Sequence, residues 1–250
     1  MRQLPSKLKP AAGFAHFFHL ALLVVLPIIV FVLVRLDFVQ LALSVIVLSK
    51  WRMFAVRPRF WAANVRANAV DLMVGLSIVL FMSQSGSVLL QLVWAVLYAG
   101  WLIFVKPATG LFMSSVQAFV GQFCALTALY LVAGETAPVF ALTLVTGLIC
   151  YLAARHFLDS FDEPYARMIS FFWGYFGAAM AWVLSHWLLF YGAIAQLTLL
   201  LSTVGYGMAV LYYLDHEDRL SKGVRRQFIF IMLAIILVVL VFSDWGDKVV

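Results

Sequence analysis

Long apolar runs alternate with short polar connections along nearly the whole chain. A helix needs about 20 apolar residues to cross the hydrocarbon core of a bilayer, and nine runs approach or reach that length. We expect helical spans at residues 14–34, 38–56, 68–84, 88–105, 111–133, 138–154, 168–191, 194–214 and 228–242. The pattern predicts an all-α, polytopic transmembrane helix bundle. Residues 1–250 would then form a single integral membrane domain with no soluble domain.

The second run is the least regular of the nine. Its uninterrupted apolar part stops at Leu48, well before the end of the run. A full crossing requires Lys50 and Arg52 to extend their charged ends toward the headgroups. The ninth run is short, and its assignment depends on its apolar length alone.

Composition supports a membrane protein and changes the interpretation of the charge. Hydrophobic residues make up 65% of the chain and charged residues 11%, with a mean hydropathy of +1.04, which excludes an ordinary soluble domain. The formal net charge is +6, but the basic residues cluster at the ends of apolar runs. That placement indicates contact with anionic lipid headgroups and argues against nucleic acid as a partner. We expect a multi-pass protein of the cell membrane.

The basic residues also predict an orientation. Nine spans with a cytoplasmic N-terminus place the tail before Phe14 and the segments 50–67, 106–110, 155–167 and 215–227 on the cytoplasmic side. These segments hold 15 of the 17 Lys and Arg residues, and only Arg35 and Lys248 fall outside them. Because cytoplasmic segments carry an excess of Lys and Arg, we expect the N-terminus to be cytoplasmic and the C-terminus external.

The segment 50–66 is the most basic of the cytoplasmic connections. Aromatic residues alternate in it with cations that include Arg52, Arg57 and Arg59. This alternation is typical of an interfacial anchor, and Pro58 divides the segment into two short pieces. The three arginines are also candidates for contact with a phosphate or a lipid headgroup.

Two acidic clusters lie on the predicted cytoplasmic side. The first contains Asp159 and Asp162, and the second contains Asp215 and Asp218. If the clusters meet in space, the four carboxylates could hold a divalent cation such as Mg²⁺ against a lipid-linked phosphate. The simpler interpretations are a helix start for the first cluster and an ion-paired loop for the second. On those interpretations we expect no cofactor.

Polar side chains within the predicted spans are few. Four glutamines, Gln91, Gln117, Gln122 and Gln196, could line a polar path for a solute. No span has a carboxylate or a cation near its midpoint, which argues against ion-coupled transport. Asp71 falls in the first turn of the third span, where its charge complements the helix dipole.

These observations favour a carrier or channel for a small or lipidic solute over an enzyme. One alternative is a membrane enzyme that acts at the cytoplasmic interface on a lipid-linked phosphate with a divalent cation. A second alternative is an assembly subunit without catalytic activity. The sequence alone does not decide between them.

Overall fold

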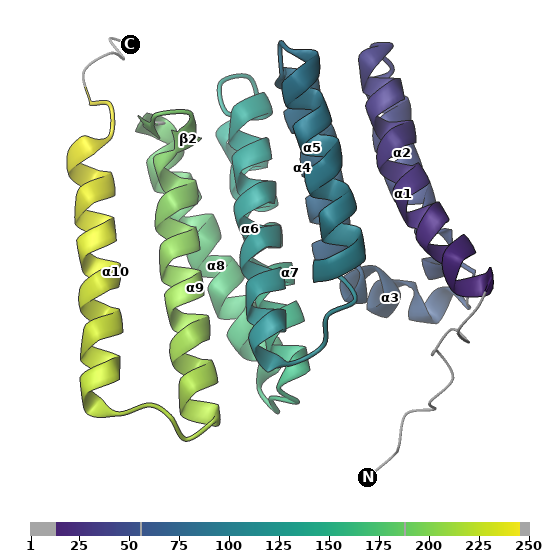
Figure 1. The fold of residues 1–250 in the computed structure, drawn as a ribbon. Coiled ribbons are helices and arrows are strands. Elements are labelled where there is room, and N and C mark those ends of the chain that lie inside the picture. The colour runs from purple at the N-terminus through teal and green to yellow at the C-terminus, as the bar shows by residue number, and fades with distance from the viewer. Residues whose placement is uncertain (1–13, 56, 188, 246–250) are drawn as a thin grey trace.

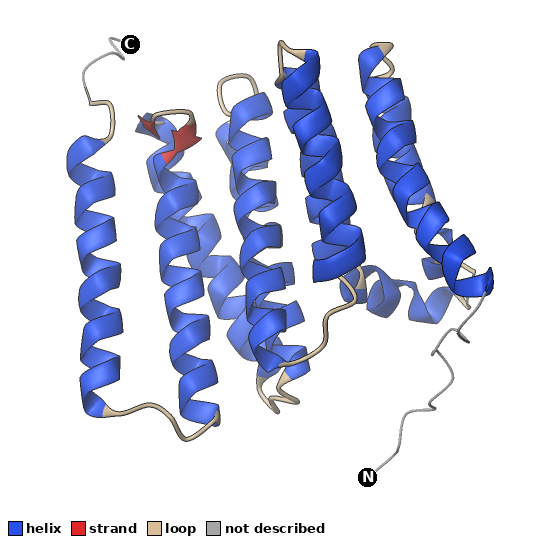
Figure 2. Ribbon diagram, viewed as in Figure 1, coloured by secondary structure: helices blue, strands red, loops and turns tan. Residues whose placement is uncertain are grey.

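The computed structural model describes residues 14–245 apart from 56 and 188, with the backbone alone for residues 14–22 and 52. The fold is all-α, with one two-residue hairpin beside it (Figures 1 and 2). The elements are α1 (Phe14–Arg35), α2 (Val39–Leu48), η1 (Trp51–Met53), η2 (Pro58–Phe60), α3 (Trp61–Ala67), α4 (Ala69–Gln84), α5 (Val88–Gly100), η3 (Trp101–Val105), α6 (Leu111–Ala133), α7 (Val139–Ser160), α8 (Ala166–Leu184), η4 (Ser185–Trp187), β1 (Phe190–Tyr191), β2 (Ile194–Ala195), α9 (Gln196–His216) and α10 (Lys222–Phe242).

Each of the nine predicted spans contains helix in the structure, although some of the helices are shorter than the predicted span. Among the described residues, six helices are long and apolar enough to cross a membrane. A seventh span results if the segment from Pro58 to Ala67 and helix α4 count as one, bent by 64°. The helices are therefore those of a membrane-embedded protein, while a count of nine crossings stays a prediction.

The expectation that the second span continues to residue 56 is wrong. Helix α2 ends at Leu48, and the chain then forms the short turns η1 and η2. The end of α2 coincides with the end of the uninterrupted apolar sequence, and Lys50 does not have the exposed side chain that an extension toward the headgroups requires. Its side chain is instead only 9% exposed and pairs with Asp71, as described below.

The helices form two layers (Figure 1). One layer contains α1, α5, α6, α9 and α10, and the other contains α2, α4, α7 and α8. Helix α4 joins the layers by packing against α5 and α6, and α6 also contacts α7. Helix α10 packs mainly against α9, so most of its apolar surface remains open to lipid.

The closest helix pair is α7 with α8, and small residues allow the approach. A Cβ atom built on Gly177 would lie 2.6 Å from the Cys150 sulfur, and one on Gly174 would lie 2.9 Å from the Gly147 carbonyl oxygen. Small residues at such positions let helix backbones approach within van der Waals distance, which is a main source of helix association in lipid. This packing fixes α8 to α7 and leaves α9 to pack against α6 instead.

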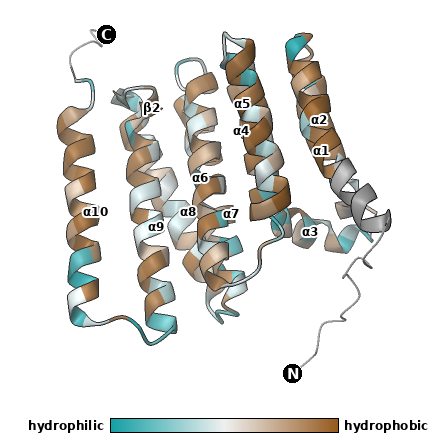
Figure 3. Ribbon diagram, in the orientation of Figure 1, coloured by the Kyte–Doolittle hydropathy of each residue, from teal (hydrophilic) through white to brown (hydrophobic). Residues whose placement is uncertain are grey.

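The polar connections gather at one end of the bundle. Helix α3, the α7–α8 connection and the α9–α10 connection all lie at the lower end in Figure 1, and Figure 3 shows hydrophilic residues there and hydrophobic residues along the helices. These segments are the ones that the charge distribution assigns to the cytoplasm. Their common location agrees with that assignment, and the side of the membrane stays a prediction.

Candidate functional site: an apolar cavity between α6, α7, α8 and α9

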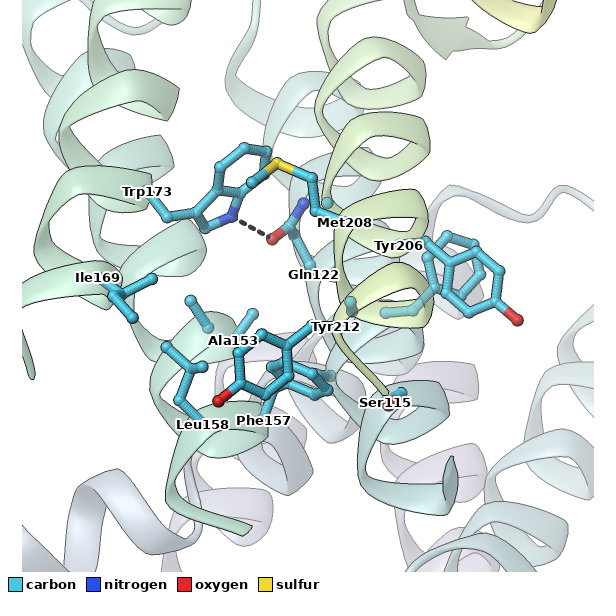
Figure 4. Close-up of a pocket in the computed structure, with 15 residues that line it drawn as sticks. Ser115, Gln122, Ala153, Phe157, Leu158, Ile169, Trp173, Tyr206, Met208 and Tyr212 are labelled. Carbon is cyan, nitrogen blue, oxygen red and sulfur yellow. Dashed lines mark hydrogen bonds between the residues drawn. The ribbon is translucent and has the colours of Figure 1, made fainter. Parts of the chain in front are cut away.

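A cavity of about 120 Å³ lies between α6, α7, α8 and α9 (Figure 4). Its walls are mostly alanine, aliphatic and aromatic side chains. They come from Ser115, Ala118, Phe119, Gln122, Ala153, Ala154, Phe157, Leu158, Ile169, Trp173, Gly205, Tyr206, Met208, Ala209 and Tyr212.

The cavity exists because small residues face it from three helices. Ala118 lies on α6, Ala153 and Ala154 on α7, and Gly205 and Ala209 on α9. Close-packed membrane helices usually fill such a space with larger side chains. Helices α8 and α9 make few contacts with each other. They do not approach closely enough to fill the space that the small residues leave.

The Gln122 amide lies at one end of the cavity, and both of its polar atoms have partners. Its Nε2 donates to the Leu201 carbonyl oxygen at 3.1 Å, and its Oε1 accepts a hydrogen bond from Trp173 Nε1 at 3.1 Å. Figure 4 shows this indole–amide bond above the cavity. Because the amide is already engaged, it holds Trp173 in place, and the cavity presents an apolar surface to a ligand.

A second polar contact involves Tyr212, which lines the cavity from α9. The Tyr212 hydroxyl donates to Glu163 Oε2, and Glu163 Oε1 accepts from the Tyr165 backbone N–H at 3.3 Å. Glu163 lies in the connection before α8, whereas Tyr212 lies near the end of α9. This bond therefore joins the two helices that otherwise make little contact.

The four glutamines do not share one path. Gln91 Nε2 donates to the carbonyl oxygens of residues 82 and 85, and Gln196 Nε2 donates to the Ser243 hydroxyl. Gln117 Nε2 donates to the Val105 carbonyl oxygen at 2.7 Å, and its Oε1 lies 3.1 Å from His156 Nε2. Of the four, Gln122 alone is among the residues that line the cavity. Each amide therefore bonds to a different set of neighbouring elements.

The two acidic clusters lie side by side at the polar end of the bundle. The Phe161 ring centroid is 5.1 Å from that of His216, which brings the connections after α7 and α9 together. Asp159 pairs with Arg155 at 2.9 Å and with Arg66 at 3.8 Å, whereas Asp162, Asp215 and Asp218 form no ion pair with any described residue. Among the described residues, no three His, Cys, Asp or Glu side chains are grouped as metal ligands would be.

Two of these aspartates have a clear structural role. Asp162 and Asp218 have φ of 51° and 55°, and each lies two residues beyond the end of its helix. The next residue, Glu163 or Arg219, donates its N–H back to the carbonyl oxygen of Leu158 or Leu214. This is the Schellman arrangement, whose left-handed position favours glycine and tolerates aspartate. Sequence reasoning found the carboxylates but missed this repeated backbone feature.

Two candidate arginines of the basic segment, Arg57 and Arg59, lie at the surface. Arg57 is exposed in the turn before η2, and the Arg59 guanidinium lies 4.6 Å from the centroid of the Phe60 ring. The side chain of Arg52 lies outside the described residues. The proposed contact of these arginines with phosphate or headgroups stays a prediction.

The structure also contains a buried ionic cluster that sequence reasoning missed. Asp71 Oδ2 contacts the ammonium groups of Lys50 and Lys106, the latter at 2.6 Å, and Oδ1 accepts from Trp101 Nε1 at 3.0 Å. The side chains of Lys50 and Asp71 are each 9% exposed, and that of Lys106 is 34% exposed. Burial lowers the pKa of Lys50, and the Asp71 carboxylate acts in the opposite direction.

Helix ends explain the location of this cluster. Lys50 and Lys106 follow the C-terminal ends of α2 and η3, and Asp71 lies in the first turn of α4. Each charge therefore lies at the helix end whose dipole favours it. The sequence placed Asp71 correctly in a first turn, but it carried no signal that both lysines would meet it.

The π-helical turn η3 brings two of the partners together. The Lys106 N–H donates to the Trp101 carbonyl oxygen at 2.8 Å, five residues back. In an α-helix, residues five apart point in different directions, whereas the wider π-helical turn places them closer to one face. Trp101 and Lys106 can therefore both reach Asp71.

Comparisons of this chain with protein-family models, with curated proteins and with solved structures find no match. The functional argument therefore depends on the geometry described above.

Proposed function

We propose that this chain is a multi-pass protein of the cell membrane that binds a lipidic solute between α6, α7, α8 and α9 and acts as its carrier. The observation that carries this proposal is the apolar cavity, whose lining amide at Gln122 is already hydrogen-bonded. A polar solute would find no free partner there. An apolar chain or ring can fill the space without leaving a polar group unpaired.

The volume limits what the cavity holds. An engineered apolar cavity of about 150 Å³ accommodates benzene, so a space of about 120 Å³ holds a ring or a few methylene groups. The rest of a longer solute would extend past α8 and α9 into the bilayer. Transfer from lipid brings little hydrophobic gain, because the acyl chains are as apolar as the cavity. Selectivity would then come from the shape set by Trp173 and the small residues.

Photo-crosslinking with a fatty acid that carries a diazirine near its methyl end tests this proposal. Ala209→Phe fills the cavity and should reduce labelling of residues in α6–α9 several-fold. Ala234→Phe on the exposed face of α10 makes the same change away from the cavity and should leave labelling unchanged. Equal labelling of both variants and the parent protein would overturn the proposal.

We further propose nine membrane crossings with the N-terminus in the cytoplasm and the C-terminus outside. The support is the location of the basic connections at one end of the bundle. Cysteines introduced at Arg59 and Ser221 should react with an impermeant maleimide only from the cytoplasmic side. Cysteines at Gly86 and Thr136 should react only from outside. Labelling of either pair from the opposite side would contradict this topology.

A further inference from the structure

A second hollow lies on the outer side of the α7–α8 pair, at the start of α8. It is lined by Tyr151, Pro164, Tyr165, Arg167, Met168 and Phe171, and its volume is about 510 Å³. It shares no lining residue with the cavity between α6, α7, α8 and α9.

The charge in this groove is positive and unpaired. Arg167 is exposed and forms no ion pair with any described carboxylate, and the lining contains no acidic residue. The nearest acid in the sequence, Glu163, is engaged by Tyr212 and by the Tyr165 backbone. The guanidinium therefore keeps its planar set of N–H donors available for a bidentate partner such as a phosphate.

Along α8 the charged lining residue comes first and the apolar ones follow, in the order of the headgroup and the acyl chains of a phospholipid. Arg167 is the second residue of α8, at the end of a candidate span. Phe171 is four residues further on the same helix face, about 6 Å deeper along the axis. Tyr165, two residues before Arg167, has an amphipathic ring of the kind enriched at headgroup level, whereas Tyr151 lies deeper, beside Gly174 of α8.

We propose that this groove binds an anionic phospholipid. The phosphate lies on Arg167, the Tyr165 hydroxyl is available as a further donor, and the first acyl carbons contact Met168, Phe171 and the Tyr151 ring. A zwitterionic lipid is a poorer match, because the groove offers no carboxylate for a choline or ethanolamine ammonium group. This inference does not depend on the proposed carrier function.

Native mass spectrometry of the detergent-solubilised protein, supplied with equal amounts of phosphatidylglycerol and phosphatidylcholine, provides the test. The parent protein should retain phosphatidylglycerol preferentially. Arg167→Gln should reduce that retention about five- to tenfold, and Arg167→Lys should restore part of it, since lysine keeps the charge without the planar fork. Elution volume and helicity confirm that each variant is folded.

Arg225→Gln is the matched control. Arg225 is also exposed at the polar end of the bundle, and it pairs with no described carboxylate. Unchanged retention in this variant supports the groove. An equal loss in Arg167→Gln and Arg225→Gln, or no loss in either, would overturn the proposal. Displacement of the lipid by millimolar inorganic phosphate would assign the site to a soluble anion and also overturn it.

Discussion

The Tyr212 hydroxyl on α9 donates a hydrogen bond to the Glu163 carboxylate in the connection that leads into α8. The bond joins two helices that have little other contact, and Tyr212 lines the cavity between them. Under the proposed carrier function, a solute that enters between α8 and α9 at this end would pass the joined pair. The bond would then act as a closure of the cavity on the side of the polar connections.

Tyr212→Phe should speed the exchange of a bound lipidic probe. The substitution keeps the ring and removes the hydrogen bond to a charged acceptor, which is worth about 1.5–3 kcal/mol when buried and less at this half-exposed site. We expect an exchange rate about fivefold higher, measured by stopped-flow quenching of a fluorescent fatty acid. Tyr206→Phe is the control, because the Tyr206 hydroxyl points away from the cavity in Figure 4. An equal increase in both variants would contradict the role assigned to Tyr212.

Asp71→Asn should be the most destabilising single change among the charged residues discussed. It leaves Lys50 and Lys106 together without a counter-charge in a buried site, which costs about 3–5 kcal/mol. Asp159→Asn should cost under about 1 kcal/mol, because the Asp159 side chain is 43% exposed. Denaturant unfolding in mixed micelles measures both. The triple variant Lys50→Met, Asp71→Leu, Lys106→Met should recover most of the stability, and a failure to recover would indicate that the charges do more than balance one another.

Gly177→Ala and Gly100→Ala should change stability in opposite directions. A methyl group on Gly177 would overlap the Cys150 sulfur, so we expect a loss of about 1–3 kcal/mol. Gly100 has nothing within 4 Å of the same position, and alanine there should stabilise the helix by about 0.5–1 kcal/mol. Adding Cys150→Ala to Gly177→Ala should relieve the overlap, which a double-mutant cycle would register as a favourable coupling. Additive effects would argue against the direct contact.

Asp218→Gly separates the backbone role of this residue from metal binding. Glycine adopts the left-handed conformation at no steric cost, so the variant should be as stable as the parent or about 1 kcal/mol more stable. Asp218→Val should be destabilising for the same reason. Both are measured by thermal unfolding with and without Mg²⁺. A Mg²⁺-dependent stabilisation of the parent that is lost in Asp218→Gly would instead support a divalent cation at this cluster.

The sequence predicted the helices well, because the signal for a membrane helix is local. The run at 111–133 coincides with α6. The predicted end of the second run is wrong, and the helix ends at Leu48, where the uninterrupted apolar sequence also ends. The cavity was not predictable, because Ala118, Ala154 and Ala209 are far apart in the sequence and look like ordinary packing residues. Lys50 and Asp71 were interpreted separately, since nothing in their spacing shows that a third residue, Lys106, completes the cluster.

The ionic cluster depends on the backbone geometry of the π-helical turn η3 as well as on the charged side chains. Its hydrogen bond from Lys106 to Trp101 spans one residue more than an α-helical bond does. If the same residues formed a regular α-helix instead, each would advance by about 100°, and Lys106 would lie about 140° around the helix axis from Trp101. A chain with that regular geometry would keep every charged residue and still separate Lys106 from Asp71, because Trp101 and Lys106 would face different sides of the helix.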